Sequence, residues 1–242
     1  PATYVGFWNR IRVQGYQAYP LQEDRYPAPE KIAAMAAGYA GQSQLSHPPV
    51  MLCLPKAWSV IRTTELPAAT RENLSDVMAF ELDRITPFGS EEAYYDFRVL
   101  KDEGDMLKVA VAAIKKEKAL PYIKALSDKE LSVTHITISL SAIGTYLNYA
   151  LGDPHAVYLG VHPKYYEGGL MRDGIMTAGC NGSFSGRPDG SLVANIGAEL
   201  NPWMQRDGAS EESPRLMVHL SGDLSDAGME EMLPWPADIL KD

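Results

Sequence analysis

The chain has 242 residues, of which 45% are hydrophobic and 22% are charged, and its 22 Lys and Arg residues against 31 Asp and Glu residues give a net charge of −9. This composition is typical of a globular protein, and the length suits one large domain or two lobes of ordinary size. The negative charge disfavours general binding to nucleic acids or anionic membranes, because both require a basic surface.

The two cysteines, Cys53 and Cys180, lie far apart in the sequence and form no C-x-x-C motif. Because nothing indicates a disulfide framework, a reducing cytoplasm is the simplest compartment. Cys53 lies in the apolar run VMLCLP and is predicted to be a buried structural thiol. No apolar stretch approaches the roughly 20 residues that a membrane-spanning helix needs. We therefore expect a soluble chain, although a domain cut from a membrane protein would show the same pattern.

The first 67 residues predict strands on both sides of one helix, and Asn9-Arg10 can make a tight turn into residues 11–20. Residues 3–8 and 58–67 are strand-like, and the continuous apolar run at 49–56 predicts a buried strand. Pro29 suits the first turn of an alanine-rich helix over residues 29–41. The predicted helix therefore lies between the first strand and the two that follow it.

The next helix is predicted from an apolar stripe that ends at a proline. Five apolar residues at helical spacing predict one buried face: Leu74, Val77, Met78, Leu82 and Ile85. Thr86 precedes Pro87 and is therefore biased away from the helical region, so the helix should end near residue 85. Glu81 and Arg84 are three residues apart and can form an ion pair worth about 0.2–0.5 kcal/mol if exposed. By this pattern MAFELDRITPF (78–88) is a packed helix with a firm end.

Residues 94–140 predict a small β-β-α-β unit, with strands at 94–100, 106–114 and 132–140. A further helix leads to Gly152-Asp153-Pro154, which is the predicted boundary between two lobes. Beyond this boundary, three segments are predicted to be strands punctuated by glycine turns: 155–162, 166–180 and 189–200. Residues 214–233 are predicted to form a buried strand, a glycine-containing loop and a helix.

No catalytic or metal-binding motif is found. The five histidines lack the spacing of metal ligands. Ser141 and Ser221 have no identifiable base partner, and neither a G-x-S-x-G motif nor a G-x-x-x-x-G-K-[ST] loop is present. Glu81, Asp83 and Arg84 could form an acid–base site only in a shared cleft with shifted pKa values, which an exposed helix end does not offer.

Three features between residues 50 and 140 carry a family resemblance. A strand is followed by Leu54-Pro55 and by a second strand that ends at Leu66-Pro67; the next helix closes on ELDRITPF (81–88), and the strand YYDFRVL follows. In this order they resemble the cytoplasmic domain of the GspL/PilM family. These are actin-like proteins of the inner-membrane platform of bacterial type II secretion systems and type IV pilus machines. The ELDRITPF motif resembles in particular the form that this motif takes in GspL-like proteins with a PilN-type C-terminal half.

The resemblance implies an α/β protein with the actin-like ATPase (ribonuclease H-like) fold, which has two lobes with mixed sheets. The N-terminal lobe would span residues 1–152 and include the small β-β-α-β subdomain at about 94–140. The C-terminal lobe would span residues 153–242.

The resemblance also places three loops that hold a nucleotide in working members of the family. The equivalents here are residues 6–9, 158–162 and 220–224. The first loop has no acidic residue between Gly6 and Asn9, the second keeps Gly160 but lacks the aspartate, and in the third Asp223 replaces a glycine beside Gly222. Without these aspartates, Mg²⁺ has no obvious oxygen ligands. We therefore predict degenerate loops, no cofactor, no metal and no ATPase activity.

The resemblance implies a non-catalytic scaffold at the cytoplasmic face of the bacterial inner membrane, tethered through a segment outside this chain. GspL types bind the secretion ATPase, whereas PilM types bind a short tail of PilN. The implied partners are a GspE/PilB-like ATPase and other platform proteins. Candidate contact residues are Glu81, Asp83, Arg84, Lys115 and Lys116. The bland alternative is that the first three belong to an ordinary helix end and that the two lysines belong to a solvated helix start. The alternative is a nucleotide-binding PilM-like switch or ATPase, supported by the glycines that the loops retain.

Overall fold

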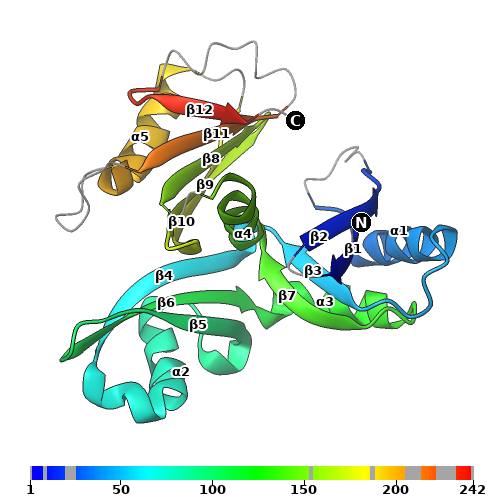
Figure 1. Ribbon diagram of the computed structural model, residues 1–242, viewed down its shortest axis with the longest axis horizontal. Coiled ribbons are helices and arrows are strands. Elements are labelled where there is room, and N and C mark those ends of the chain that lie inside the picture. The colour runs from blue at the N-terminus through cyan, green and yellow to red at the C-terminus, as the bar shows by residue number, and fades with distance from the viewer. Residues whose placement is uncertain are drawn as a thin grey trace. The chain divides into compact units, whose positions relative to one another are not determined.

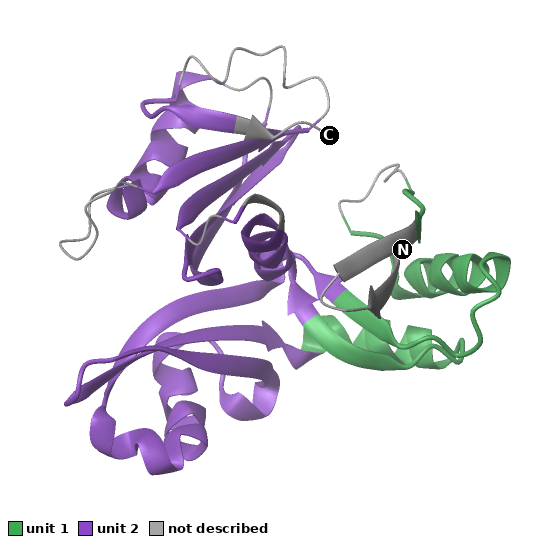
Figure 2. Ribbon diagram, viewed as in Figure 1, with its two compact units in different colours: residues 1–52, 117–136 green, residues 53–116, 137–242 purple. Residues whose placement is uncertain are grey.

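The structure is a computed structural model that describes residues 2–7, 10–19, 26–152, 155–185, 189–204, 214–221 and 233–240. The chain divides into two compact units, each made from two separate stretches (Figure 2). The first unit comprises residues 1–52 and 117–136, and the second comprises residues 53–116 and 137–242. The predicted lobes divide the chain once, after residue 152, and this division stays a prediction.

The first unit holds an N-terminal hairpin, two helices and most of a second strand pair. The hairpin joins β1 (Ala2–Phe7) to β2 (Arg10–Tyr16) in antiparallel orientation, and the second pair joins β3 (Val50–Leu54) to β7 (Val133–Ile138). The helices are α1 (Pro29–Gln42) and α3 (Lys116–Ser127). Pro29 begins α1, as its fixed φ and missing N–H predict. Tyr122 of α3 donates a 2.8 Å hydrogen bond to the carbonyl of Pro27, just before α1.

In the second unit, an antiparallel sheet carries the helix predicted from MAFELDRITPF. The strands β4 (Ser59–Pro67), β6 (Met106–Lys115) and β5 (Ala93–Asp102) lie in the order β4-β6-β5, and α2 (Leu74–Ile85) covers one face (Figure 1). The short 3-10 helices are η1 (Lys56–Trp58), η2 (Ala68–Asn73) and η3 (Ser90–Glu92). Alternate residues of β6 meet the apolar stripe of α2 in one core, which includes Leu107, Val109, Val111, Met78 and Leu82. The predicted helix, its buried face and its end at residue 85 are confirmed.

The predicted order β-β-α-β within residues 94–140 is present as β5, β6, α3 and β7. Its strands enter two different sheets, because β5 and β6 pair with β4 whereas β7 pairs with β3. A sequence pattern indicates that a segment is a strand, but distant parts of the chain determine which strand becomes its neighbour.

The other sheet of the second unit is mixed. Its order is β10-β9-β8-β11-β12. Three consecutive strands form an antiparallel meander: β9 (Tyr165–Arg172) runs antiparallel to both β8 (Ala156–His162) and β10 (Ile175–Ser183). β11 (Arg215–Leu220) runs parallel to both β8 and β12 (Ala237–Leu240). The helix α5 (Gly190–Met204) packs on one face, and α4 (Ser139–Leu151) contacts β9 and β10.

The segment 189–200 forms most of α5, so its prediction as a strand is wrong. Leu192, Ile196 and Leu200 lie four residues apart and are at most 4% exposed, which gives α5 its buried stripe. Asp189 accepts hydrogen bonds from the backbone N–H groups of Ser191 at 3.0 Å and Leu192 at 3.1 Å, as an N-cap residue does. The spacing and this capping residue are sequence signals for a helix, but the glycines around them favoured a hairpin.

Cys53 is exposed, so its prediction as a buried thiol is wrong. Its neighbours Leu52 and Leu54 are buried, and adjacent strand residues point to opposite faces. The apolar run is therefore buried on one face only. Cys180, by contrast, is 7% exposed, and burial raises the pKa of its thiol to about 12.

Candidate functional site

Residues 158–162, predicted as the second nucleotide loop, lie within β8, and the third predicted loop starts at Leu220, the last residue of the neighbouring strand β11. Gly160 of β8 lies opposite His219 of β11 in a parallel pair, and the Ser221 N–H donates a 3.0 Å hydrogen bond to the Val161 carbonyl. In open α/β sheets, ligands bind beyond the carboxyl ends of parallel strands. This edge is therefore the first candidate site.

A polar and aromatic cluster lies at this edge. Ser221 Oγ lies 2.8 Å from His162 Nδ1, the His162 ring stacks on Tyr165 with centroids 4.3 Å apart, and His219 approaches His162 edge-on at 6.1 Å. The prediction that Ser221 has no base partner is therefore wrong. The two residues are 59 positions apart, and only the pairing of β8 with β11 brings them together. A Ser–His hydrogen bond is one requirement of a nucleophilic pair, and it also fastens the ends of two strands.

Gly160 has a packing role in β8. A Cβ atom at this position would lie 2.7 Å from the hydroxyl of Tyr158, whose side chain is 4% exposed. Burial raises the pKa of the Tyr158 hydroxyl above its ordinary value. The glycine therefore leaves room for a buried tyrosine.

The remaining residues of the predicted loops are only partly described. Gly6 lies in β1 opposite Ile11 of β2. Asn9, Gly222 and Asp223 lie outside the described residues. The degeneracy of the three loops stays a prediction.

A buried lysine joins the two sheets of the second unit. Lys56 is 5% exposed, and its Nζ donates hydrogen bonds of 3.3 Å to the Ser59 carbonyl and to Asn181 Oδ1. Its backbone N–H donates to Ser139 Oγ at 3.0 Å, and that hydroxyl donates to Glu167 Oε2 at 3.1 Å. Burial lowers the pKa of the Lys56 amine, although nearby anionic groups oppose this effect. The sequence predictions do not include this network, although Lys56 stands in the apolar run CLPKAW.

The end of α2 is fixed by side-chain hydrogen bonds. Arg84 Nε donates to Glu81 Oε2 at 2.7 Å, which confirms the predicted ion pair, and its Nη2 donates to Thr64 Oγ1 of β4 at 3.0 Å. Thr86 Oγ1 lies 2.9 Å from the Leu82 carbonyl and accepts a 3.3 Å hydrogen bond from the Phe88 N–H. The motif thus carries both a helix end and its attachment to the sheet.

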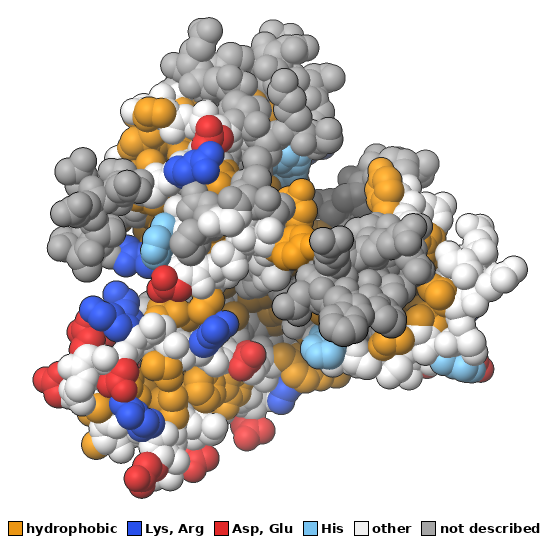
Figure 3. Space-filling view, in the orientation of Figure 1, with side chains coloured by type: hydrophobic (Ala, Val, Ile, Leu, Met, Phe, Trp, Pro, Cys, Tyr) orange, Lys and Arg blue, Asp and Glu red, His pale blue; other side chains and the backbone are white. Residues whose placement is uncertain are grey.

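The other candidate contact residues also lie in or next to this part of the chain. Asp83 is exposed, and its carboxylate lies beside the backbone of Gly89. Lys115 ends β6, and Lys116 Nζ donates a 2.9 Å hydrogen bond to the Glu91 carbonyl and lies 5.6 Å from the Tyr94 ring centroid. In Figure 3, basic and acidic side chains surround apolar surface over β4, β5 and β6.

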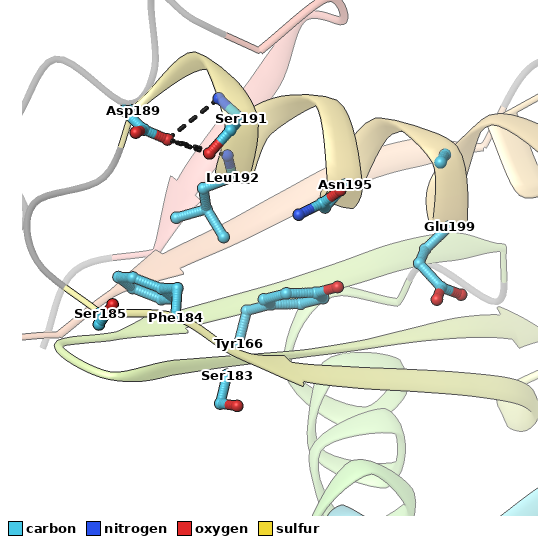
Figure 4. A pocket seen from close by; sticks show the side chains of 10 residues that line it. Tyr166, Ser183, Phe184, Ser185, Asp189, Ser191, Leu192, Asn195 and Glu199 are labelled. Carbon is cyan, nitrogen blue, oxygen red and sulfur yellow. Dashed lines mark hydrogen bonds between the residues drawn. The ribbon is translucent and has the colours of Figure 1, made fainter.

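A cleft of about 480 Å³ lies between α5 and the end of β10. Figure 4 shows Asp189 at the start of α5, Glu199 farther along the helix, and the rings of Tyr166 and Phe184 facing it from the sheet. Hydrogen bonds from Ser191 and the Leu192 N–H lower the pKa of the Asp189 carboxyl. The Asp189 carboxylate already caps the helix, and the Glu199 carboxylate also lines the cleft. The negative charge of these two groups disfavours a phosphate ligand. None of the residues predicted from the sequence as site residues lines this cleft.

Two kinds of feature are absent from the described residues. No group of three or more His, Cys, Asp or Glu side chains among them could hold a metal ion. None of the helices in these ranges is both long and apolar enough to cross a membrane.

Comparison with known proteins adds sequence and structural relatives. The chain matches no protein-family model. A segment of 55 residues, or 22% of the chain, is 42% identical to type II secretion system protein L of Xanthomonas campestris pv. campestris, and it spans 15% of that protein's length. The PilM–PilN type IV pilus biogenesis complex is similar over 99% of this chain and 84% of the matched chain, with a TM-score of 0.74 and 16% identity.

A second solved structure is the cytoplasmic domain of EpsL, an inner-membrane component of the type II secretion system of Vibrio cholerae. It is similar over 88% of this chain and 76% of that one, with a TM-score of 0.53 and 14% identity. This protein therefore has the actin-like fold, which confirms the predicted fold class. The protein L segment and the two structures also confirm the predicted resemblance to the GspL/PilM family.

Proposed function

We propose that this chain is a non-catalytic scaffold, the cytoplasmic domain of an inner-membrane platform protein in type II secretion or type IV pilus biogenesis. On this proposal it recruits the GspE/PilB-like ATPase of the machine and contacts other platform proteins. The observation that carries it is the segment 42% identical to secretion protein L within a fold similar to PilM and EpsL. A tether outside this chain would hold the domain at the cytoplasmic face of the membrane.

The geometry at the end of α2 supports a binding role for this part of the chain. Glu81 and Arg84 form an ion pair on the surface of the second unit, where the Glu81 side chain is 24% exposed and that of Arg84 is 63% exposed. We propose these two residues, together with Asp83, Lys115 and Lys116, as contacts for the ATPase or another platform protein.

The rival function is a nucleotide-binding switch of the PilM type. It is favoured by the cluster of His162 and Ser221 at the carboxyl ends of β8 and β11, where α/β sheets bind ligands. Against it, residues 158–162 contain no acidic side chain, and Gly160 accommodates Tyr158. We therefore propose that the nucleotide loops are degenerate.

Calorimetry with ATP and Mg²⁺, followed by a pull-down with the co-encoded ATPase, tests the scaffold proposal. We expect no heat of ATP binding and capture of the ATPase. The Asp83→Lys variant should lose capture, whereas Asp128→Lys, at an exposed acidic residue after α3, should keep it. Micromolar ATP binding would support the switch, and ATP hydrolysis without capture would overturn the scaffold.

A further inference from the structure

Phe80 projects from α2 into solvent. It is 81% exposed, more than any other large hydrophobic residue whose exposure the structure describes. Met78 and Leu82, two positions away on either side, are fully buried. Because successive helical residues are turned by about 100°, Phe80 lies on the face opposite the core. The core of the second unit therefore leaves this ring without cover.

Carboxylates flank the exposed ring along the same helix face. Asp76 lies four residues before Phe80 and Asp83 lies three residues after it, and both are exposed. Neither forms an ion pair with a described cation. Arg84, the basic residue of the last turn, already binds Glu81 at 2.7 Å and Thr64 at 3.0 Å. The surface around Phe80 therefore combines one aromatic ring with uncompensated negative charge.

We infer that Phe80, Asp76 and Asp83 form a docking surface for a cationic amphipathic segment of another protein. Its apolar side chains would cover the Phe80 ring, and its Lys or Arg side chains would meet the two carboxylates. Charge complementarity selects this occupant. An anionic membrane and a second copy of this chain, which has a net charge of −9, would both be repelled. The inference rests on the proposed scaffold function and names the chemistry of its partner.

The two parts of this surface should contribute differently to binding. A desolvated aromatic ring at the centre of an interface is a typical hot spot, whose truncation weakens binding by about thirtyfold or more. Exposed charges at the rim contribute less affinity but make association dependent on salt. Loss of Phe80 should therefore weaken binding at any ionic strength, and loss of the carboxylates should flatten the salt dependence.

Binding of a labelled 18-residue Leu/Lys amphipathic helical peptide to the whole chain tests this surface, with fluorescence anisotropy as the readout. We expect Phe80→Ala to bind the peptide at least tenfold more weakly than the unchanged chain, a somewhat smaller loss than a full hot spot gives. The double variant Asp76→Asn/Asp83→Asn should lose most of the salt dependence. Tyr146→Ala, which removes a 65% exposed aromatic residue from α4, should bind normally. The matched Leu/Glu peptide should not bind. Equal binding to Phe80→Ala, or binding of the Leu/Glu peptide, would overturn the inference.

Two further measurements separate other occupants from this one. Sedimentation in which the chain self-associates, and Phe80→Ala does not, would assign the surface to a second copy and overturn the cationic partner. Phe80-dependent binding to vesicles with anionic lipids would assign it to a membrane. If the ATPase is captured equally by Phe80→Ala and the unchanged chain while the peptide distinguishes them, this surface serves another partner. If the ATPase is not captured at all, the scaffold proposal fails, and the peptide measurement still decides the inference.

Discussion

At the scale of single residues, Lys56 departs furthest from its ordinary preference, because lysine is rarely buried without an anionic partner. Its two Nζ acceptors are a carbonyl and an amide oxygen, neither of which carries a charge. Gly179 allows the side chain to pass, since a Cβ there would lie 2.6 Å from Lys56 Cε. Lys56 therefore links the β3–β4 connection to β10 by a hydrogen bond, and its amine is buried in an apolar environment.

We predict that Lys56→Met stabilises the protein by about 1 kcal/mol at neutral pH, because it removes a buried charge and keeps the length of the side chain. Burial lowers the pKa of the folded amine, so the unfolded chain binds the proton more tightly. The destabilisation of the folded state by the Lys56 charge is therefore complete below the pKa of the folded chain. It disappears as the pH rises past the pKa of the unfolded chain, which is about 10.5. Urea unfolding between pH 7 and 11 should show that the gain in free energy of unfolding of Lys56→Met over the unchanged chain becomes smaller as the pH rises. Lys124→Met, at an exposed position, should show none.

Gly160→Ala should destabilise the protein by about 1–3 kcal/mol, because the added methyl would press on the buried Tyr158 hydroxyl in a packed core. Gly38→Ala is the matched control, since a Cβ there meets nothing within 4 Å and alanine favours the α1 helix. Thermal unfolding of both variants gives the comparison. An unchanged melting temperature for Gly160→Ala would show that this glycine is not needed for packing.

At the scale of elements, the end of α2 shows how a short motif combines local and distant contacts. Pro87 ends the helix through its effect on Thr86, as the sequence predicts. The buried Thr86 hydroxyl then satisfies backbone groups at the turn, and Arg84 reaches Thr64 of β4. The proline and the threonine are local signals, whereas the contact with β4 depends on the pairing of strands.

Thr86→Val should destabilise the protein by about 1–2 kcal/mol, because it leaves the Phe88 N–H without this acceptor and removes one of the two donors to the Leu82 carbonyl, which keeps the Thr86 N–H. Thr86→Ser keeps the hydroxyl and should therefore lose less stability than Thr86→Val. Chemical denaturation of the two variants measures the difference. If valine and serine behave alike, the hydroxyl does not hold the helix end.

At the scale of the whole molecule, the chain crosses repeatedly between its two units, so neither unit is one continuous segment. The centre of the mixed sheet is its most protected part. Val157, Leu159 and Val161 of β8 are fully buried, as are Met217 and Val218 of β11. In the sheet β4-β6-β5, by contrast, the edge strand β5 pairs with β6 alone among the strands of the described residues.

Amide hydrogen exchange should follow this arrangement. We predict the slowest exchange in β8 and β11, because these strands are paired on both sides and open only in large unfolding events. β5 should exchange faster, since one of its edges has no neighbouring strand in the described structure. Mass spectrometry of peptides from the three strands measures the rates. Equal protection of β5 and β8 would contradict the prediction.

The sequence by itself determined the local features of this protein. The apolar stripe of α2, its end before Pro87 and the strands of residues 49–67 and 94–114 follow from spacing and turn residues, and the family resemblance predicted the actin-like fold. Only the tertiary structure decided which strands pair, that Ser221 meets His162, that Lys56 is buried and that Phe80 is not. Spacing along the chain reports which residues share a face. It does not report what that face meets, because contacts between distant segments depend on how the elements assemble.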